Sequence, residues 1–337
     1  MAQQMQAWQA AHPGSFESVF KFHDTISKPT AQSLKSGQVL VQVSRAALNP
    51  ADYKIVELGM AARLITSFPK IPGMDLSGRI VAVADDVTEA KEGDLVLARA
   101  TPTKAFGSLA QFTVCDREGY SVIPQDFDLE QAAGVGTAGL TAYQTIAPYV
   151  KAGDKVFING GSGGVGLWGV QIAKAIGCQV TVSCSTGKAD LCKSLGADDV
   201  IDYKTSDVVT ELQKRGQVFS LCVDNVGNAP PNLYAYSNDF LLPGSHFVFV
   251  GGHVSAKSVL SLSTNLVRPS FLGGVKIKFV TYATANKRKD LDQLRDWMVE
   301  GKVKTIIAAT YSFQEADKAF EYLKKGSSAG KIIIQVE

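Results

Sequence analysis

Long apolar runs are missing from this sequence. No stretch approaches the roughly 18 consecutive apolar residues that a transmembrane helix needs. The first residues, MAQQMQAWQAAHPGSF, also lack the basic region followed by an apolar segment that marks a secretory signal. We therefore expect a protein without a membrane span that resides in the cytoplasm.

Cysteine and histidine are scarce, and neither sign of charge prevails. The 5 cysteines, an odd number, predict free thiols in a reducing compartment rather than a disulfide framework. They show no C-x-x-C-like zinc spacing, and the 4 histidines stand apart from them in the sequence. Lys plus Arg number 34 against 32 for Asp plus Glu, which gives no electrostatic reason to expect nucleic acid or an anionic membrane as a partner.

Two hydrophobicity patterns divide the chain. From about residue 36 to 124, short apolar or alternating segments lie between turn residues, which predicts a small, mostly antiparallel, barrel-like domain. From about residue 154, strand-like segments alternate with helix-length segments, which predicts a doubly wound parallel sheet. We therefore predict an α/β fold in which a parallel-sheet domain, residues 130–284, is inserted between two parts of the barrel-like domain, residues 1–129 and 285–337.

A glycine-rich turn follows the first strand of the parallel-sheet region. The segment NGGSGGVG (159–166) contains a G-x-G-x-x-G pattern directly after a buried strand and at the start of an amphipathic helix. Glycines permit the tight turn and close backbone approach, and the helix N-terminus offers N–H donors to a pyrophosphate. The pattern predicts a Rossmann dinucleotide site, and a turn without a ligand is the alternative. The predicted binding residues are Gly161, Ser162, Gly163, Gly164, Val165 and Gly166.

The end of the next strand lacks the carboxylate expected of an NAD site. In such sites an Asp or Glu about 20 residues after the glycines binds the ribose 2′-hydroxyl. Here Ser185, Thr186 and Lys188 follow the strand, and hydroxyls with an ammonium suit a 2′-phosphate instead. The sequence therefore favours NADPH as the cofactor. The alternative is that these residues form only a turn and a solvated first turn of a helix.

Short motifs are spread along the chain: NPAD at 49–52, PGMD at 72–75 with a following glycine, GD at 93–94, the glycine-rich turn, and GK at 330–331. Together they resemble the medium-chain dehydrogenase/reductase superfamily, in its zinc-free quinone-oxidoreductase branch. Segments such as NPADYKIVELGM, SLGADDVIDYK and EGKVKTII are similar to alkenal/one oxidoreductases and the chloroplast envelope quinone oxidoreductase. The resemblance begins near residue 36 and implies a Rossmann domain inserted in a GroES-like catalytic domain. Tyr53, where relatives often carry Trp, and the segments 61–70 and 253–274 depart from the pattern.

The resemblance also implies what stands at the position of a catalytic zinc. Zinc-dependent relatives bind the metal through a cysteine and a His-Glu pair, and these positions align with Asn49, Met74 and Asp75. An amide and a thioether do not replace thiolate and imidazole as zinc ligands. The structural-zinc lobe is missing too, because residues 99–111 contain no cysteine. We therefore predict no metal and negligible oxidation of simple alcohols, which needs a Lewis acid.

The remaining feasible reaction is hydride delivery to an electrophilic acceptor, whose developing enolate needs hydrogen-bond donors. The candidate donors are the Asn49 amide, the Tyr53 hydroxyl and the Lys54 ammonium. Asn49, which relatives place beside the nicotinamide, has the alternative role of a helix cap, and Lys54 that of a solvated side chain. The resemblance further implies cofactor contacts, for which ordinary loop positions are the alternative, at Thr137, Thr141, Tyr203, Gly251 and Gly252.

These patterns predict an NADPH-dependent, zinc-independent reductase of the C=C bond of enones or enals, or of quinones. One alternative is a trans-acting enoyl reductase of a polyketide pathway, and another is a non-catalytic NADPH-binding protein with a structural or RNA-binding role. The expected partner is the small-molecule substrate. The alternating segment VKIKFVTY (275–282) predicts an edge strand through which a homodimer would form, although Lys276 and Lys278 oppose such pairing. The physiological substrate and the proton donor stay open.

Overall fold

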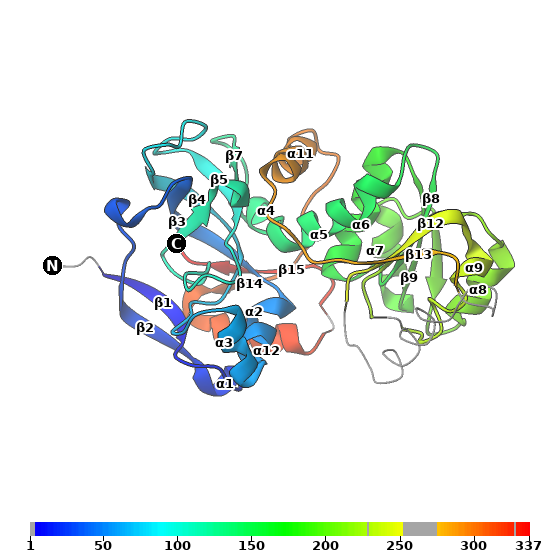
Figure 1. Ribbon diagram of the computed structural model, residues 1–337, viewed down its shortest axis with the longest axis horizontal. Helices are drawn as coiled ribbons and strands as arrows, with labels where there is room; N and C mark the ends of the chain where they lie inside the picture. The colour runs from blue at the N-terminus through cyan, green and yellow to red at the C-terminus, as the bar shows by residue number, and fades with distance from the viewer. Residues whose placement is uncertain (1–3, 228, 252–274, 327) are drawn as a thin grey trace. The chain divides into compact units, whose positions relative to one another are not determined.

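The computed structural model describes residues 4–227, 229–251, 275–326 and 328–337 (Figure 1). These residues belong to two compact units. Unit 1 comprises 1–140, 286–301 and 305–337, and unit 2 comprises 141–285 and 302–304. The first boundary lies inside helix α5 (Gly136–Ile146), later than the position after residue 129 expected from the pattern. The reason is that α4 (Leu129–Ala133), just before α5, packs on strands β3, β4 and β5 of unit 1.

Unit 1 is built on a mostly antiparallel sheet. Its strands in spatial order are β14 (Ile307–Ser312), β15 (Lys331–Gln335), β3 (Gln38–Leu48), β4 (Asp75–Val83), β5 (Leu95–Arg99) and β7 (Tyr120–Ile123). Strand β6 (Phe112–Asp116) also pairs with β3, and β1 (Gln4–Ala10) pairs with β2 (Phe20–Ser27) in a separate hairpin. Only β14 and β15 run parallel. The further helices are α1 (Phe16–Val19), α2 (Pro50–Glu57), α3 (Ala62–Ile65), α11 (Arg288–Val299) and α12 (Ala316–Lys324).

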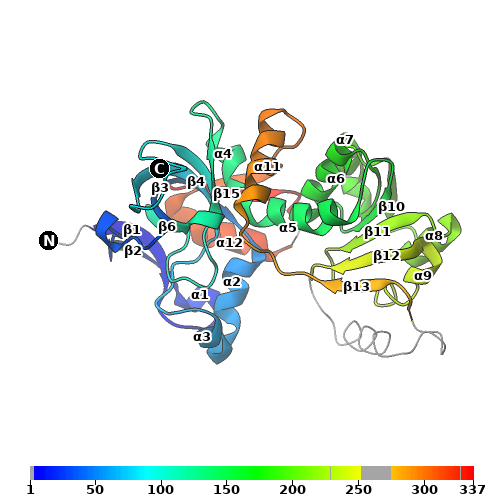
Figure 2. The same ribbon diagram turned by 45° about the horizontal axis from the view of Figure 1, so that its top comes forward.

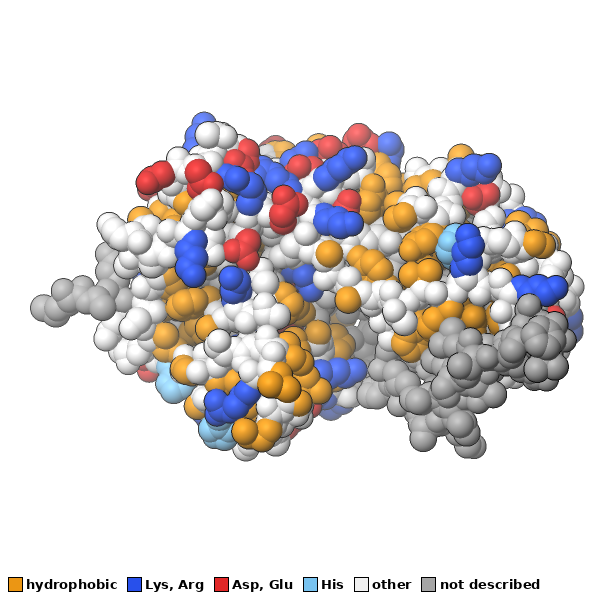
Figure 3. Space-filling model, viewed as in Figure 1, with side chains coloured by type: hydrophobic (Ala, Val, Ile, Leu, Met, Phe, Trp, Pro, Cys, Tyr) orange, Lys and Arg blue, Asp and Glu red, His pale blue; other side chains and the backbone are white. Residues whose placement is uncertain are grey.

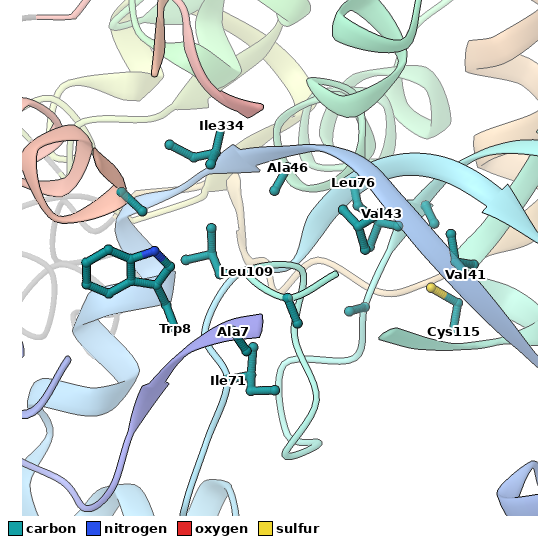
Figure 4. Packing of buried hydrophobic residues seen from close by; sticks show 14 of the residues in the cluster. Ala7, Trp8, Val41, Val43, Ala46, Ile71, Leu76, Leu109, Cys115 and Ile334 are labelled. Carbon is teal, nitrogen blue, oxygen red and sulfur yellow. The ribbon is translucent and has the colours of Figure 1, made fainter. Parts of the chain in front are cut away.

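The core of unit 1 lies under the long strand β3. Val41 and Val43 lie on one face of β3 with the period-2 spacing of a strand, and Ala46 follows a register shift between Val43 and Arg45; all three are fully buried. Figure 4 shows their side chains on the same side of the β3 ribbon as Leu109, with which they share the core. The Trp8 indole N–H donates to the carbonyl of Phe313 at 2.7 Å, so the ring is buried with its polar atom satisfied.

Helix α2 follows β3 directly, and its start is specified locally. Asn49 is the N-cap residue and Pro50 occupies the first helical position, where a missing N–H costs nothing. The Asn49 backbone N–H donates to the Asp52 carboxylate at 2.7 Å, which closes the first turn. Val56, one turn further on, is buried against the core.

Unit 2 contains the predicted parallel sheet, which Figure 2 shows with its helices. The strands in spatial order are β10 (Asp199–Asp202), β9 (Gln179–Cys184), β8 (Lys155–Asn159), β11 (Phe219–Asp224), β12 (Leu241–Phe249) and β13 (Lys278–Thr281), all parallel. The helices are α6 (Gly164–Ile176), α7 (Ala189–Ser194), α8 (Val208–Arg215) and α9 (Ser237–Phe240). The strand order reverses at β8 and β11, as in a doubly wound sheet. The predicted α/β fold class is therefore confirmed.

Three smaller expectations also have structural outcomes. The segment expected as an edge strand forms β13, which is shorter than predicted and is last in its sheet. Within the described ranges, each helix is too short or too polar to cross a bilayer. All 5 cysteines are free and buried.

Candidate functional site

The glycine-rich turn of unit 2 connects β8 to α6 and is held by close backbone packing. A Cβ on Gly166 would lie 2.2 Å from the carbonyl oxygen of Gly160, and a Cβ on Gly161 would lie 2.5 Å from Cβ of Val182. Glycine is therefore required at both positions for the turn and the helix to pack against the sheet. A Cβ on Gly164 would meet no atom within 4 Å, so the start of α6 is open there. The N–H groups of its first turn have no partner within the helix and suit a pyrophosphate.

Three buried polar side chains fix the shape of this turn. The Asn159 amide donates to Asp224 Oδ1 at 2.9 Å, and its oxygen accepts from the Ser183 hydroxyl. Ser183 Oγ in turn accepts from the backbone N–H of Gly160 at 2.9 Å. The motif alone did not reveal these residues, because they come from three different strands, β8, β9 and β11. Their role is to position the turn.

The predicted 2′-phosphate residues share one 3-10 turn, Thr186–Lys188, with Ser185 before it. The Thr186 hydroxyl donates to Asp202 at the end of β10, and this bond is the main reason that the pKa of Asp202 lies below its ordinary value. The carboxylate also accepts from the backbone N–H of Lys204 at 2.9 Å. The next residue after Asp202, Tyr203, has an exposed ring. The structure thus brings these predicted residues together at the ends of the neighbouring strands β9 and β10.

Two further predicted cofactor residues of unit 2 are described. The Thr141 hydroxyl is buried and lies 2.5 Å from the hydroxyl of Thr284. Gly251 follows β12 with φ of 115°, a left-handed conformation that favours glycine, and a Cβ there would meet open space. Gly252 lies outside the described residues.

In unit 1, Asn49 belongs to a buried polar cluster. Its amide nitrogen donates to Asp75 Oδ2 at 2.9 Å and to the carbonyl of Ala47 at 3.4 Å. Its amide oxygen accepts from the Lys331 ammonium at 2.6 Å. Lys331 also donates to Asp75 Oδ2 at 3.0 Å and to the carbonyl of Leu48 at 3.0 Å, so the ion pair is enclosed by hydrogen bonds. The cluster joins β3, β4 and β15, and 256 residues separate its two charges.

Thr137, predicted from resemblance to lie near the nicotinamide, belongs to the same cluster. Its hydroxyl donates to Asp75 Oδ1 at 2.6 Å, and its backbone N–H donates to the same oxygen at 2.7 Å. The hydroxyl also accepts from Arg99 Nε at 3.1 Å. Another Arg99 nitrogen contacts the sulfur of Met74 at 3.6 Å. Sequence reasoning missed Arg99, because a buried arginine at the end of β5 matches no motif.

Asp52 is a second buried carboxyl group near this cluster. Burial, and then the charge of Asp75, raise its pKa from an ordinary 3.8 to about 7. Its Oδ2 accepts the Asn49 backbone N–H, and its Oδ1 has no partner among the described residues. Lys70 is also buried, and burial lowers its pKa to about 8. Its ammonium donates to the carbonyls of Pro102 and Lys104 at 2.8 and 2.6 Å.

Tyr53 and Lys54, the other two predicted catalytic residues, lie on α2 but outside the cluster. The Tyr53 ring packs edge-on against Phe16, with the Lys324 ammonium 4.8 Å from its centre. Its hydroxyl makes no hydrogen bond within the described part of the chain, and burial raises its pKa above the ordinary value. Lys54 is partly exposed, and its side chain makes no hydrogen bond or ion pair with the described residues.

Comparisons with known proteins match the chain along its length. A family model described as alcohol dehydrogenase GroES-like domain matches residues 35–152, and one described as zinc-binding dehydrogenase matches residues 195–334. A trans-enoyl reductase of Aspergillus terreus is 41% identical, over 99% of this chain and 96% of that protein. The chain belongs to the medium-chain dehydrogenase/reductase family.

Two further similar proteins indicate the branch of the family to which the chain is related. A 2-methylene-furan-3-one reductase of Solanum lycopersicum is 31% identical, over 98% of this chain and 79% of that protein. The structure of a quinone oxidoreductase from Coxiella burnetii has a TM-score of 0.83 and 27% identity, and covers 99% of this chain and 100% of that one. The predicted resemblance to the quinone-oxidoreductase branch is confirmed. The protein is an oxidoreductase that uses NAD(P)H.

The name zinc-binding dehydrogenase raises the question whether this member of the family fits a metal. Asn49 and Asp75 saturate each other and the Lys331 ammonium, and the sulfur of Met74 faces Arg99. A cation on these atoms would be repelled by two fixed positive charges. The residues do not fit zinc. Within the described ranges, no three His, Cys, Asp or Glu side chains are arranged to hold a metal ion.

Proposed function

We propose that this protein is an NADPH-dependent reductase that delivers hydride to the C=C bond of α,β-unsaturated carbonyl compounds or to quinones, without zinc. The observation that carries the proposal is the saturated cluster of Asn49, Asp75 and Lys331. One Asn49 N–H in this cluster is bound only weakly, to the carbonyl of Ala47 at 3.4 Å, and can donate to an acceptor oxygen. An alcohol dehydrogenase would use a Lewis acid for that purpose. A conjugated acceptor spreads the incoming charge into an enolate that such donors stabilise.

NADPH, when bound, supplies the hydride. The open start of α6 at Gly164 would receive its pyrophosphate, and the turn at Ser185, Thr186 and Lys188 its 2′-phosphate. Preference for NADPH over NADH is supported by the absence of a carboxylate at the end of β9, where Ser185 follows Cys184. Asp202, at the end of β10, is engaged by Thr186 and by the backbone N–H of Lys204.

Asn49 would hold the acceptor's oxygen through the weaker of its two donor bonds. The bond to Asp75 is 2.9 Å, but the contact with the carbonyl of Ala47 is 3.4 Å and therefore weak. This N–H would therefore leave the carbonyl of Ala47 and donate to the substrate oxygen instead. The Lys331 ammonium on the amide oxygen draws electron density from the amide and strengthens the N–H as a donor.

Tyr53 and Lys54 are proposed to stabilise the enolate together with Asn49. The Tyr53 hydroxyl makes no hydrogen bond with the described residues, and burial raises its pKa, so it keeps its proton at neutral pH. It is therefore able to donate a hydrogen bond to the enolate, or a proton to the carbon next to the carbonyl. Lys54, one position further along α2, would add a positive charge near the developing oxyanion.

A second candidate function is a trans-acting enoyl reductase of a polyketide pathway. The observation in its favour is the 41% identity with a protein named trans-enoyl reductase, over nearly the full length of both chains. Both candidates reduce the C=C bond next to a carbonyl. They differ in the group attached to that carbonyl, which in an enoyl thioester is the thioester sulfur. Comparison of free enones with enoyl thioesters separates them.

The test of the proposed function is a turnover assay with purified protein. NADPH oxidation is followed with quinones, enals, cyclic enones and enoyl thioesters, and NADP reduction with simple alcohols. We expect activity with at least one conjugated acceptor class, and negligible activity with the alcohols. Exhaustive chelation should leave the rate unchanged. Rapid alcohol oxidation with inert enones would reject the proposal.

The cofactor preference has its own test. We expect kcat/KM for NADPH to exceed that for NADH at least tenfold, which corresponds to about 1.4 kcal/mol. Lys188→Ala should weaken NADPH and leave NADH unchanged. Equal weakening of both cofactors would remove Lys188 from the 2′-phosphate site.

We also propose a cytoplasmic homodimer. The support is the position of β13 at the end of its sheet, where no second described strand pairs with it, so that its outer edge invites pairing with a second copy. Light scattering at micromolar concentration should give twice the 35.9 kDa of the chain. The monomer mass would reject the dimer.

A further inference from the structure

A row of exposed apolar side chains follows α2. Leu58, Met60, Leu64 and Ile65, here called the apolar lip, are 48, 76, 90 and 43% exposed. Half of the 8 large hydrophobic side chains that are exposed in the described residues fall within this one segment. Figure 3 shows hydrophobic side chains gathered over α2 and α3. Scattered exposed apolar residues need no explanation, but a contiguous set marks a binding surface.

The apolar lip stands on a fixed backbone. Ala62, in its middle, is fully buried, and α3 packs against α2. The N–H of Thr66 donates to the carbonyl of Ala62 at 2.9 Å, and the Thr66 hydroxyl donates to the carbonyl of Thr103 at 3.1 Å. The exposure is therefore built into the fold of unit 1 and does not come from a frayed end.

The position of the lip relates it to the acceptor-binding residues. Asn49 caps the N-terminus of α2, and Leu58 lies at its C-terminus. The 8 helical residues between them span about 12 Å. Residues 58–66 contain no carboxylate, and their one charged side chain is Arg63, which lies over the ring of Phe68 at 5.9 Å. A chain that leaves an acceptor carbonyl held at Asn49 and follows α2 reaches at this end a segment whose exposed side chains are mostly apolar.

We propose that the apolar lip binds the alkyl chain of the acceptor, so that the preferred substrates are enals, enones or enoyl groups with a medium or long chain. This inference rests on the proposed function. The lip is too small for a stable subunit interface, because four side chains cannot supply the roughly 800 Å² per partner that such interfaces bury. With Arg63 as its one cation, it also lacks the basic residues that attract an anionic membrane.

The test is a chain-length series of trans-2-alkenals from crotonaldehyde to trans-2-dodecenal, with NADPH as donor. Once the chain reaches the lip, each added methylene should raise kcat/KM, by up to about fourfold if fully buried. In the Met60→Ser/Leu64→Ser double variant, the ratio of kcat/KM for dodecenal to that for crotonaldehyde should fall at least tenfold. Val299→Ser is the matched control, because Val299 is 54% exposed in the same unit but far from the lip in sequence. It should keep the wild-type ratio.

A second readout separates failure of the inference from failure of the proposed function. Calorimetric binding of the saturated aldehydes, which are the expected products, measures the chain-length dependence without turnover. Turnover whose chain-length dependence is unchanged in the double variant overturns the inference and leaves the function standing. Lip-dependent binding without any turnover supports the lip and counts against the function. If the double variant differs from the wild type in the mass measured by light scattering, the lip binds a second copy of the chain. If the wild type floats with phosphatidylcholine vesicles and the double variant does not, the lip binds a membrane. Either result would overturn the inference.

Discussion

The buried ion pair between Lys331 and Asp75 is the contact whose removal should cost unit 1 the most. The ammonium and carboxylate side chains are 4% and 0% exposed, and their N···O distance is 3.0 Å. Lys331→Met keeps the length of the side chain but deletes the ammonium. The carboxylate of Asp75 then stays buried with the donors of Thr137 and Asn49 but without its cation. Leaving such a charge unpaired costs about 3–5 kcal/mol of unfolding free energy.

A surface pair provides the matched control for this prediction. Lys174 and Asp198 have the same N···O distance of 3.0 Å, but their side chains are 34% and 47% exposed. Lys174→Met should therefore cost less than about 1 kcal/mol, because water screens the pair. Urea unfolding followed by tryptophan fluorescence compares the two variants, and Trp8 reports on unit 1. Equal losses in both variants would refute the reasoning.

The double variant Asp75→Asn/Lys331→Met supplies a further check on the same argument. It removes both charges, so no uncompensated ion is left inside unit 1. We expect it to be more stable than Lys331→Met alone, which makes the interaction between the two substitutions non-additive. A loss equal to the sum of the two single losses would show that the charges do not act as a pair.

Three other outcomes follow from the described contacts. Asp52 keeps its proton in the folded state up to about pH 7, whereas the unfolded chain releases it near pH 3.8. The unfolding free energy of the wild type should therefore fall relative to that of Asp52→Asn as the pH rises through this window. If urea unfolding gives the same difference between the two proteins at pH 4 and pH 8, the prediction is wrong. Gly166→Ala should lower Tm because its Cβ meets backbone, whereas Gly164→Ala should leave Tm unchanged and raise the KM for NADPH; equal Tm values would disprove the packing argument. Asn49→Ala should lower kcat and kcat/KM together by about 10²–10³, and a change of KM alone would assign it to ground-state binding.

The sequence predicted the parts of this protein whose signals are local. The change from alternating to helical periodicity predicted a mostly antiparallel sheet followed by a parallel one. The buried strand before NGGSGGVG and the amphipathic helix after it identified that motif as a dinucleotide-binding turn. Resemblance pointed to Asn49 and Thr137 separately. Their meeting on Asp75 could not be read from the sequence, because it requires β3 to pair with β4 so that Ala47 lies opposite Asp75, and Thr137 to reach the same carboxylate across 62 residues. Tertiary contacts of this kind have no local pattern.

The residues that shape the cofactor turn show the same limit. Asn159, Ser183 and Asp224 stand at the ends of three strands, and only the order of the sheet brings them together. The packing of Tyr53 against Phe16 and Lys324 likewise depends on α12 returning to α2 from the far end of the chain. Sequence reasoning located these residues' elements but not their partners.

The most direct measurement of the central claim is the fate of the hydride. The protein is given an enone and NADPH that carries deuterium at the transferred position, and the product is analysed by NMR and mass spectrometry. We predict a saturated ketone with one deuterium on the β-carbon and a solvent proton on the carbon next to the carbonyl. An unsaturated alcohol with deuterium on the carbonyl carbon would contradict the claim, because it would mean that the carbonyl itself accepts the hydride.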